Sequence, residues 1–254
     1  MQDSFPKKPI VTVITIVFNS KDLLEKTILS VLGQDYKFVE YIIIDGGSTD
    51  GTVDIIKKYN DRLAYWVSER DSGLYDAMNK GIRQAKGDYL WFINSGDQIY
   101  STETLQLLFE DKAIYPDVMY GQTVMIDSGA NEIGTRRLKP PKNLTWKSLG
   151  MGMLVSHQSI LVKRDIVPFY DLKYKFSADF DWMVKVLKRA KSIQNTDLIL
   201  SKFLDGGLTK QNIVPGLKER FHIMCKNYGT ISTVLRHFII GIKFLIFVVR
   251  FKRF

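Results

Sequence analysis

The stretch "YIIIDGGSTDGT" (Tyr41–Thr52) joins an uninterrupted apolar run to a polar, glycine-rich turn. The run shows no polar alternation, which is typical of a strand covered on both faces. Three similar runs occur in the first hundred residues: "IVTVITIVF" (10–18), "LAYWVSE" (63–69) and "YLWFIN" (89–94). Helical spacing of apolar residues separates the runs, most clearly over 74–85. This alternation predicts an α/β fold with a mostly parallel, doubly wound, Rossmann-like sheet.

The second half of the chain is less regular. "DVMYGQTVMID" (117–127) predicts one arm of a hairpin, "HQSILVKRD" (157–165) a short strand, and "SADFDWMVKVLKRAK" (177–191) a helix. No linker rich in Pro, Gly or Ser divides the first 205 residues. We therefore predict one domain over 1–210, followed by a basic helical segment over 211–254.

Charge is distributed unevenly along the chain. The net charge is +9, and residues 206–254 hold nine Lys or Arg against one acid, Glu219. A basic tail on a nearly neutral body indicates a local anionic partner rather than a generally basic surface. The single cysteine, Cys225, excludes an intrachain disulfide, and "MQDSFPKKPI" does not resemble a secretory signal. Both observations favour the cytoplasm.

Polar residues follow each of the four apolar runs. They are Phe18-Asn19-Ser20, Asp45 to Thr52, Ser68 to Gly81, and Asn94-Ser95-Gly96-Asp97. In parallel sheets, ligands bind beyond the carboxyl ends of the strands, so four polar ends on one edge predict a site. Asp45 could accept hydrogen bonds from a base or a ribose. The alternative is a tight βα turn with its helix cap, which explains Gly47, Asp50 and Thr52 equally well.

Several of these motifs carry a resemblance to a known family. "VTVITIVFN", "IIIDGGSTDGT", "RDSGLYDAMNKGI", "FINSGD" and "SADFDW" resemble the ordered motifs of family 2 glycosyltransferases with the GT-A fold. The resemblance covers roughly residues 10–210 and is closest to bacterial enzymes that build O-antigens, capsules and other polysaccharides. It implies a transferase that uses a nucleotide-sugar, commonly UDP-linked, with a donor half over 1–100 and an acceptor half over 101–210.

The resemblance also implies roles for individual residues. Those matching nucleotide and donor positions are Thr15, Asn19, Asp45, Arg70, Asp71, Asp76, Asn94 and Ser95. The family's Asp-x-Asp metal motif reads Asn94-Ser95-Gly96-Asp97 here, so only the trailing carboxylate remains. A Mn²⁺ or Mg²⁺ ion would then be held by Asp97, with His157 as a supplementary ligand. Alternatively, Arg70 or Lys80 stabilises the leaving diphosphate in place of a strong metal site.

An inverting transferase needs a carboxylate that deprotonates the acceptor hydroxyl. Asp179 matches the family's catalytic aspartate, whereas Asp181 is expected to point elsewhere. Both could instead be acids that stabilise a helix N-terminus. For His157, a buried structural histidine is the alternative to a role in the site.

The tail "RHFIIGIKFLIFVVRFKRF" (236–254) has too few consecutive apolar residues to span a membrane. Arg236, Lys243 and Arg250 are seven apart, which predicts an amphipathic basic helix lying on an anionic membrane surface. Packing on the domain or on a second subunit is the alternative. We expect a peripheral protein on the inner face of the bacterial plasma membrane that acts on a saccharide or a lipid-diphosphate-linked saccharide, with no nucleic acid as partner.

Two other functions remain open from the sequence. A nucleotidyltransferase shares the nucleotide-binding sheet, but "FNSKDLLEKT" lacks the glycine-rich signature expected after its first strand. A GT-A-fold binding protein that has lost catalysis would account for the absence of aspartate at 94 and 96.

Overall fold

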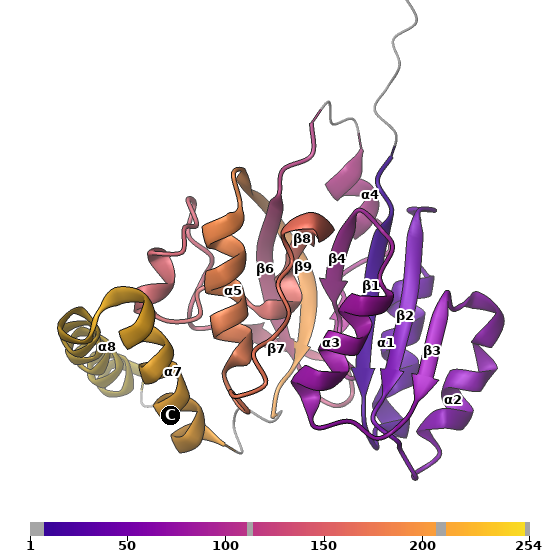
Figure 1. Ribbon diagram of the computed structural model, residues 1–254, viewed down its shortest axis with the longest axis horizontal. Helices are drawn as coiled ribbons and strands as arrows, with labels where there is room; N and C mark the ends of the chain where they lie inside the picture. The colour runs from indigo at the N-terminus through magenta and orange to yellow at the C-terminus, as the bar shows by residue number, and fades with distance from the viewer. Residues whose placement is uncertain (1–7, 111–113, 207–211, 252–254) are drawn as a thin grey trace, which may run out of the picture.

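The structure is a computed structural model that describes residues 8–110, 114–206 and 212–251, with side chains up to Ile242 in the last helix. Its centre is one nine-stranded sheet in the order β3-β2-β1-β4-β8-β6-β9-β5, with β7 paired to β6. Figure 1 shows this sheet with helices in front of it and behind it.

Four parallel strands form the N-terminal half of the sheet. They are β1 (Val11–Val17), β2 (Val39–Asp45), β3 (Tyr65–Ser68) and β4 (Tyr89–Phe92). All seven residues of β1 are buried, because helices cover both faces of the sheet. The parallel arrangement predicted from the apolar runs is confirmed.

The other half of the sheet is mixed. β8 (Ile160–Lys163) is antiparallel to β4 and to β6 (Val118–Ile126), and β6 forms the predicted hairpin with β7 (Glu132–Thr135). β9 (Ile193–Leu204) is parallel to β6 and antiparallel to the short β5 (Gln98–Ile99). The expectation of a mostly parallel sheet therefore holds for the first half only.

Helices cover the two faces of the sheet in separate groups. α1 (Lys21–Leu32), α2 (Thr52–Lys58) and α4 (Thr104–Phe109) share one core with Val11, Val13 and Val17. α3 (Leu74–Gln84) and α5 (Ala178–Arg189) share the other core with Ile14 and Ile16. The alternation of side chains along β1 thus assigns each helix group to its face. Short 3₁₀ turns η1 (Asn60–Arg62), η2 (Ser148–Met151), η3 (His157–Ser159) and η4 (Arg164–Ile166) lie between these elements.

Two further helices end the described chain, α7 (Ile213–Tyr228) and α8 (Thr230–Phe251). α7 is tied to the segment before α5 by the Glu219 carboxylate, which accepts backbone N–H bonds from Lys175, Phe176 and Ser177 at 2.8–2.9 Å. The boundary predicted between 210 and 211 lies outside the described residues. Among the helices described, none combines the length and apolar character needed to cross a bilayer.

Candidate active site

The carboxyl ends of the parallel strands meet at one edge of the sheet, the lower edge in Figure 1. Val17 of β1 is in register with Asp45 of β2, and Asp45 is in register with Ser68 of β3. The N-terminal turn of α5 reaches the same edge, because the Asp179 Oδ1 accepts a hydrogen bond of 3.4 Å from the Tyr75 hydroxyl on α3. The strand-end residues singled out in the sequence therefore converge, as predicted.

Asp45 organises the turn after β2. Its side chain is fully buried and accepts hydrogen bonds from the backbone N–H groups of Gly47 (3.1 Å) and Ser48 (2.9 Å). The hydroxyls of Ser48 and Ser68 also donate to it, at 2.5 and 2.6 Å. The carboxylate thus holds the glycine-rich turn against β3, and its predicted contact with a base or ribose stays a prediction.

The loop after β1 is joined to this turn. Asn19 has a positive φ of 44°, its Oδ1 accepts a 2.9 Å hydrogen bond from the Thr49 N–H, and its own N–H donates to the Ser48 hydroxyl. Thr15, in contrast, lies inside the sheet, where its hydroxyl donates to the Ile93 carbonyl at 2.7 Å. Thr15 therefore lies below the exposed edge that carries Asn19.

The β3–α3 segment carries three of the predicted donor residues, Arg70 and Asp71 in the loop and Asp76 in the first turn of α3. Asp71 and Asp76 accept the N–H groups of Gly73 (2.8 Å) and Ser72 (3.0 Å), so both carboxylates order the start of α3. The Asp71 Oδ2 also lies against Gly46, where an added Cβ would come within 2.7 Å of it. A larger residue at position 46 would therefore require this carboxylate to move. Arg70 is exposed beside them.

Lys80, the other cation considered for the diphosphate, has an acidic partner. Its Nζ lies 2.8 Å from the Glu69 carboxylate and also donates to the Arg70 carbonyl at 3.2 Å. Of these two cations on the β3–α3 segment, Arg70 is the more exposed.

The residues Asn94 to Asp97 form a tight turn, with the Asp97 N–H bonded to the Asn94 carbonyl at 2.9 Å. The Asp97 carboxylate is only 4% exposed and accepts hydrogen bonds from Gln158 Nε2 (2.8 Å) and the Leu204 N–H (3.0 Å). Burial raises the pKa of Asp97 to about 7, against the opposing effect of these bonds. Asp97 therefore fastens the end of β9 to the turn. Ser95 bonds to the Ser20 hydroxyl at 3.0 Å.

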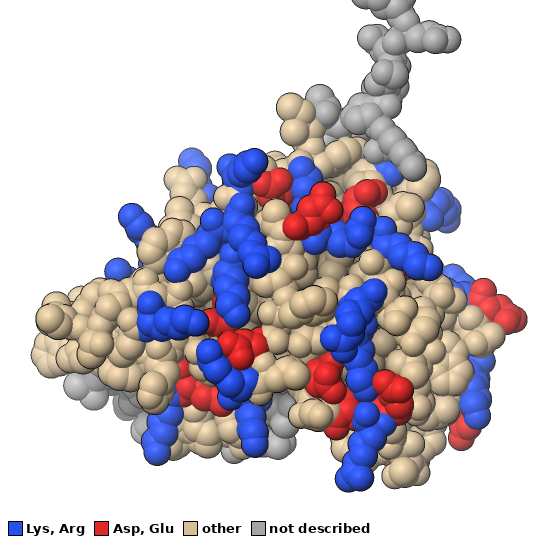
Figure 2. Space-filling model, in the orientation of Figure 1, with Lys and Arg blue, Asp and Glu red and all other residues tan. Residues whose placement is uncertain are grey.

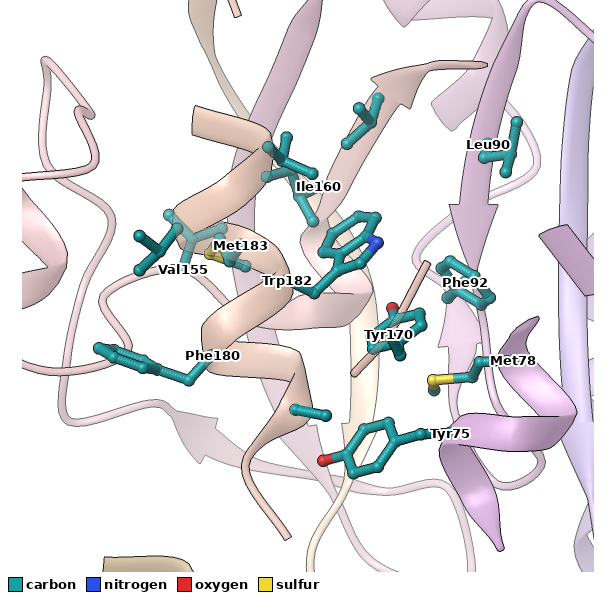
Figure 3. Close-up of a cluster of buried hydrophobic side chains, with 14 of the residues drawn as sticks. Tyr75, Met78, Leu90, Phe92, Val155, Ile160, Tyr170, Phe180, Trp182 and Met183 are labelled. Atoms are coloured by element: carbon teal, nitrogen blue, oxygen red, sulfur yellow. The ribbon is translucent and has the colours of Figure 1, made fainter. Parts of the chain in front are cut away.

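His157 lies in an aromatic cluster. Its Nε2 is 2.6 Å from the Tyr170 hydroxyl, and its ring packs against Phe92 and Trp182. Burial lowers the pKa of His157 to about 4, although the charge of Asp179 opposes this shift. The imidazole is thus neutral near pH 7, as expected for the structural alternative. Figure 3 shows the surrounding cluster, with Tyr170 between Phe92 and Trp182.

The described side chains do not by themselves form a complete site for a divalent cation. Asp97 and His157 belong to separate hydrogen-bond networks, and across 8–110, 114–206 and 212–242 no three His, Cys, Asp or Glu side chains gather as a ligand set. One buried oxygen, Oδ1 of Asn94, lacks a hydrogen-bond partner in the described structure. Mg²⁺ or Mn²⁺ at this turn would therefore take most of its ligands from waters and from the phosphate oxygens of a bound donor.

Asp179 is the carboxylate best placed for chemistry. It is partly exposed in the first turn of α5, and Tyr75 is its hydrogen-bond donor across the site. Asp181 differs: it is 2% exposed, and Lys185 Nζ approaches it at 2.5 Å as an ion pair. The structure thus separates the two acids, one facing the site and one neutralised within its own helix.

Three residues of this region escaped the sequence analysis. Tyr75 lies within a quoted motif, but its contact with Asp179 spans 104 positions in the chain. Arg136 and Arg220 both lie near Asp179, and the signal for Arg136 was the basic loop "RRLKPPKNLTW" (136–146). Nothing in the sequence pairs Arg220 with that loop.

Comparisons with known proteins agree with this architecture. An uncharacterized glycosyltransferase of Mycobacterium tuberculosis is 34% identical over 182 residues, which cover 70% of this chain and 68% of the relative. TuaG of Bacillus subtilis, a glycosyltransferase named for teichuronic acid biosynthesis, is 29% identical over 164 residues, covering 62% of this chain and 64% of TuaG. The fold matches residues 1–349 of S. aureus TarS with a TM-score of 0.66 at 18% identity, covering 90% of this chain and 72% of that one.

The match to a family model decides the identity. The model described as glycosyl transferase family 2 matches residues 12–167, a span that includes the strand-end loops and the turn from Asn94 to Asp97. The edge that gathers Asp45, Arg70 and Asp179 is therefore the candidate active site of a glycosyltransferase, and the chain belongs to glycosyl transferase family 2.

Proposed function

We propose that this glycosyltransferase moves a sugar from a UDP-sugar to an acceptor hydroxyl with inversion, and that Asp179 is the general base. The acceptor oxygen attacks the anomeric carbon while an Asp179 oxygen takes its proton. The bond from that carbon to the diphosphate oxygen breaks, and UDP leaves with the electron pair. Because attack and departure occur on opposite faces of the sugar, the configuration inverts.

The observation that carries this proposal is the position of Asp179. It is a partly exposed carboxylate that shares the edge with the loops following β1, β2 and β3. A general base needs reach to the acceptor proton before it needs a matched pKa. Asp45 and Asp97 are buried and have both carboxylate oxygens occupied, and Asp71 and Asp76 accept the backbone N–H groups at the start of α3.

The donor assignment rests on the loops around Asn19, Asp45 and Arg70. TarS, whose fold matches with a TM-score of 0.61 in its UDP-GlcNAc complex, supports a UDP-sugar as donor. In this assignment the exposed Arg70 guanidinium binds the diphosphate and stabilises the charge that develops on it.

The first test is calorimetric titration of the full chain with UDP, in EDTA and separately in Mn²⁺. We expect UDP to bind with a dissociation constant of about 1 μM–1 mM, the usual range for enzyme substrates. We expect Mn²⁺ to change this affinity less than about threefold, because the Asn94–Asp97 turn offers few free oxygens. Binding only in Mn²⁺ would restore the metal site predicted from the sequence.

A matched variant sharpens this test. Arg70→Gln is expected to weaken UDP binding about tenfold or more, since a charged hydrogen bond to phosphate is lost. Arg83→Gln, an exposed arginine further along α3, serves as the control. If UDP, GDP and dTDP all fail to bind, the donor assignment is wrong, and if UDP binds without turnover on any acceptor, the binding-protein alternative gains support.

For the acceptor, we propose a saccharide linked to a lipid diphosphate, used in bacterial surface polysaccharide synthesis. TuaG, named for teichuronic acid biosynthesis, supports this class of pathway. Such an acceptor would be met at the cytoplasmic side of the plasma membrane, where nucleotide-sugars are found.

We propose further that α8 lies on that membrane. Its residues Ile231, Val234, Leu235, Phe238, Ile239 and Ile242 are 44–80% exposed and recur at helical spacing. In Figure 2 the projecting left end, where Figure 1 places α8, is almost uncharged on the visible face. An apolar stripe of this kind is typical of an interaction surface. Lys243, Arg250, Lys252 and Arg253 follow it in the sequence and favour anionic lipid.

One member of the predicted basic stripe has another role. Arg236 packs against the Tyr228 ring, with 5.3 Å from its Cζ to the ring centroid, and its Nε donates to Ser232 at 3.1 Å. α8 therefore directs this arginine toward the body of the protein and its apolar stripe outward. The side chains of Lys243 and Arg250, and all of 252–254, lie outside the described residues.

Sedimentation with vesicles tests the membrane proposal. Wild type is expected to bind vesicles containing phosphatidylglycerol and to bind pure phosphatidylcholine less, whereas Phe238→Glu should lower binding at least tenfold by placing a charge in the apolar layer. Leu107→Glu, which changes an exposed leucine on α4, is the control. The stripe would instead contact a second copy if wild type binds no vesicles and forms a stable dimer that Phe238→Glu dissociates.

A further inference from the structure

Two arginines from distant parts of the chain lie together beside Asp179. Arg136 follows β7, and its Nη2 donates to the Met153 carbonyl at 3.1 Å. Arg220 belongs to α7, and its Cζ lies 5.4 Å from the ring centroid of Phe180, the residue after Asp179. Arg220 is therefore next to the N-terminal turn of α5, and Arg136 is close enough to interact electrostatically with Arg220 and with Asp179.

The pair carries more positive charge than its surroundings neutralise. Burial and the charge of Arg220 lower the pKa of Arg136, while Asp179 opposes the shift. Arginine nevertheless stays protonated in proteins, so two like charges are held close together. Glu219, adjacent to Arg220 in sequence, is engaged by the three backbone N–H groups before α5. Within the described part of the chain, neither arginine forms an ion pair within 4.0 Å.

One hydrogen-bond donor of the pair is unused. Nε of Arg220 is buried and has no partner in the described structure. A buried donor without a partner is costly, so it commonly marks the place of a group that binds there. Two guanidinium groups that share an unpaired donor suit the oxygens of a phosphate, which arginine binds in a bidentate manner.

The location of the pair assigns it to the acceptor side. Arg136 lines a small pocket with Gln122, Thr123, Lys139 and Ser156, residues of β6 and of the loops beyond it. In the sheet, β4 and β8 separate β6 from the strands that carry the donor loops. Arg136 thus lies on the β6 side of the sheet, away from the strands that carry the donor loops.

We propose that Arg136 and Arg220 form a binding site for a phosphate or diphosphate group of the acceptor. The proposal rests on the proposed function, in which Asp179 deprotonates the acceptor hydroxyl. Because Arg136 interacts electrostatically with Asp179 and Arg220 packs on Phe180, the next residue, we expect the phosphate on the same sugar as the attacking hydroxyl or on a neighbouring one. The acceptor class is then a short saccharide attached to phosphate, rather than a long neutral glycan.

Pyrophosphate is the probe for this site, with the donor site filled. The full chain is saturated with UDP in EDTA and titrated with inorganic pyrophosphate by calorimetry. Wild type is expected to bind it, and Arg136→Gln and Arg220→Gln are each expected to weaken binding about ten- to hundredfold, as for the loss of charged hydrogen bonds. Arg189→Gln, at the far end of α5, should bind pyrophosphate as wild type does.

Each result separates this proposal from the donor assignment. Failure of wild type to bind UDP appears before pyrophosphate is added, and it overturns the proposed function. If UDP binds but pyrophosphate does not bind, the acceptor site is refuted. It is also refuted if pyrophosphate binds wild type and all variants equally. If the glutamine variants lose UDP affinity instead, the pair belongs to the donor diphosphate. If circular dichroism shows that either glutamine variant is unfolded, Arg→Lys at the same position replaces it. Lysine keeps the charge but lacks the bidentate guanidinium, so pyrophosphate binding is still expected to weaken.

Discussion

Asp179→Asn is expected to lower kcat by about 10²–10⁴-fold while the affinity for UDP stays within about twofold of wild type. The asparagine keeps the size of the side chain but cannot take the acceptor proton. In the proposed function Asp179 faces the acceptor, so the nucleotide loses no partner. The measurement is UDP release from a UDP-sugar in the presence of saccharides linked to lipid diphosphate, together with UDP calorimetry.

The neighbouring acid provides the control for Asp179. Asp181→Asn makes the same change two residues along α5, at a carboxylate that is buried and paired with Lys185. It should lower stability but leave kcat of the folded enzyme within a fewfold of wild type. Equal losses of kcat in both variants would indicate damage to α5 rather than loss of a base.

Asp45→Ala is expected to lower the free energy of unfolding by about 3–5 kcal/mol and to weaken UDP binding at least tenfold. Four donors from Gly47, Ser48 and Ser68 lose their acceptor, and each buried donor left unpaired costs about 1–3 kcal/mol, part of which relaxation of the loop recovers. The turn that Asp45 holds would then no longer present its glycines to a ligand. Urea denaturation and calorimetry measure the two effects.

The same experiment distinguishes two roles of Asp45. Asp54→Ala, which removes an exposed carboxylate from the adjacent helix α2, should change neither quantity appreciably. If Asp45→Ala keeps wild-type stability yet loses UDP, the carboxylate contacts the nucleotide directly, as the family resemblance implies. Loss of both assigns it the organising role seen in its hydrogen bonds.

Much of the N-terminal half could be predicted because its strands are buried on both faces. The run 10–18 became β1 over Val11–Val17, and the run 89–94 became β4 over Tyr89–Phe92. β9 escaped prediction, since Gln194, Asn195 and Asp197 interrupt its apolar pattern and much of the strand is only partly buried. Its pairing with β6 also needs Gly121, where a Cβ would come within 2.4 Å of the Leu198 carbonyl.

For the site, local sequence identified the edge but not what each side chain does there. Asp45, Asp97 and His157 occupy the predicted region, yet their partners Ser68, Gln158 and Tyr170 lie 13 to 61 positions away. Whether a polar residue is exposed to a ligand or buried against a neighbour depends on those partners. A motif cannot specify them, because it records only adjacent residues.

The sequence by itself determined the parallel α/β half and the edge at which a ligand site is predicted, since burial pattern and strand ends are local properties, and its family resemblance implied Asp179 as the base to test. Only the tertiary structure decided which carboxylates stay free. It also brought Arg136 and Arg220 together across 84 positions and turned the apolar stripe of α8 outward. These outcomes depend on distances between segments that fold onto one another, and such distances are set by packing rather than by any stretch of chain.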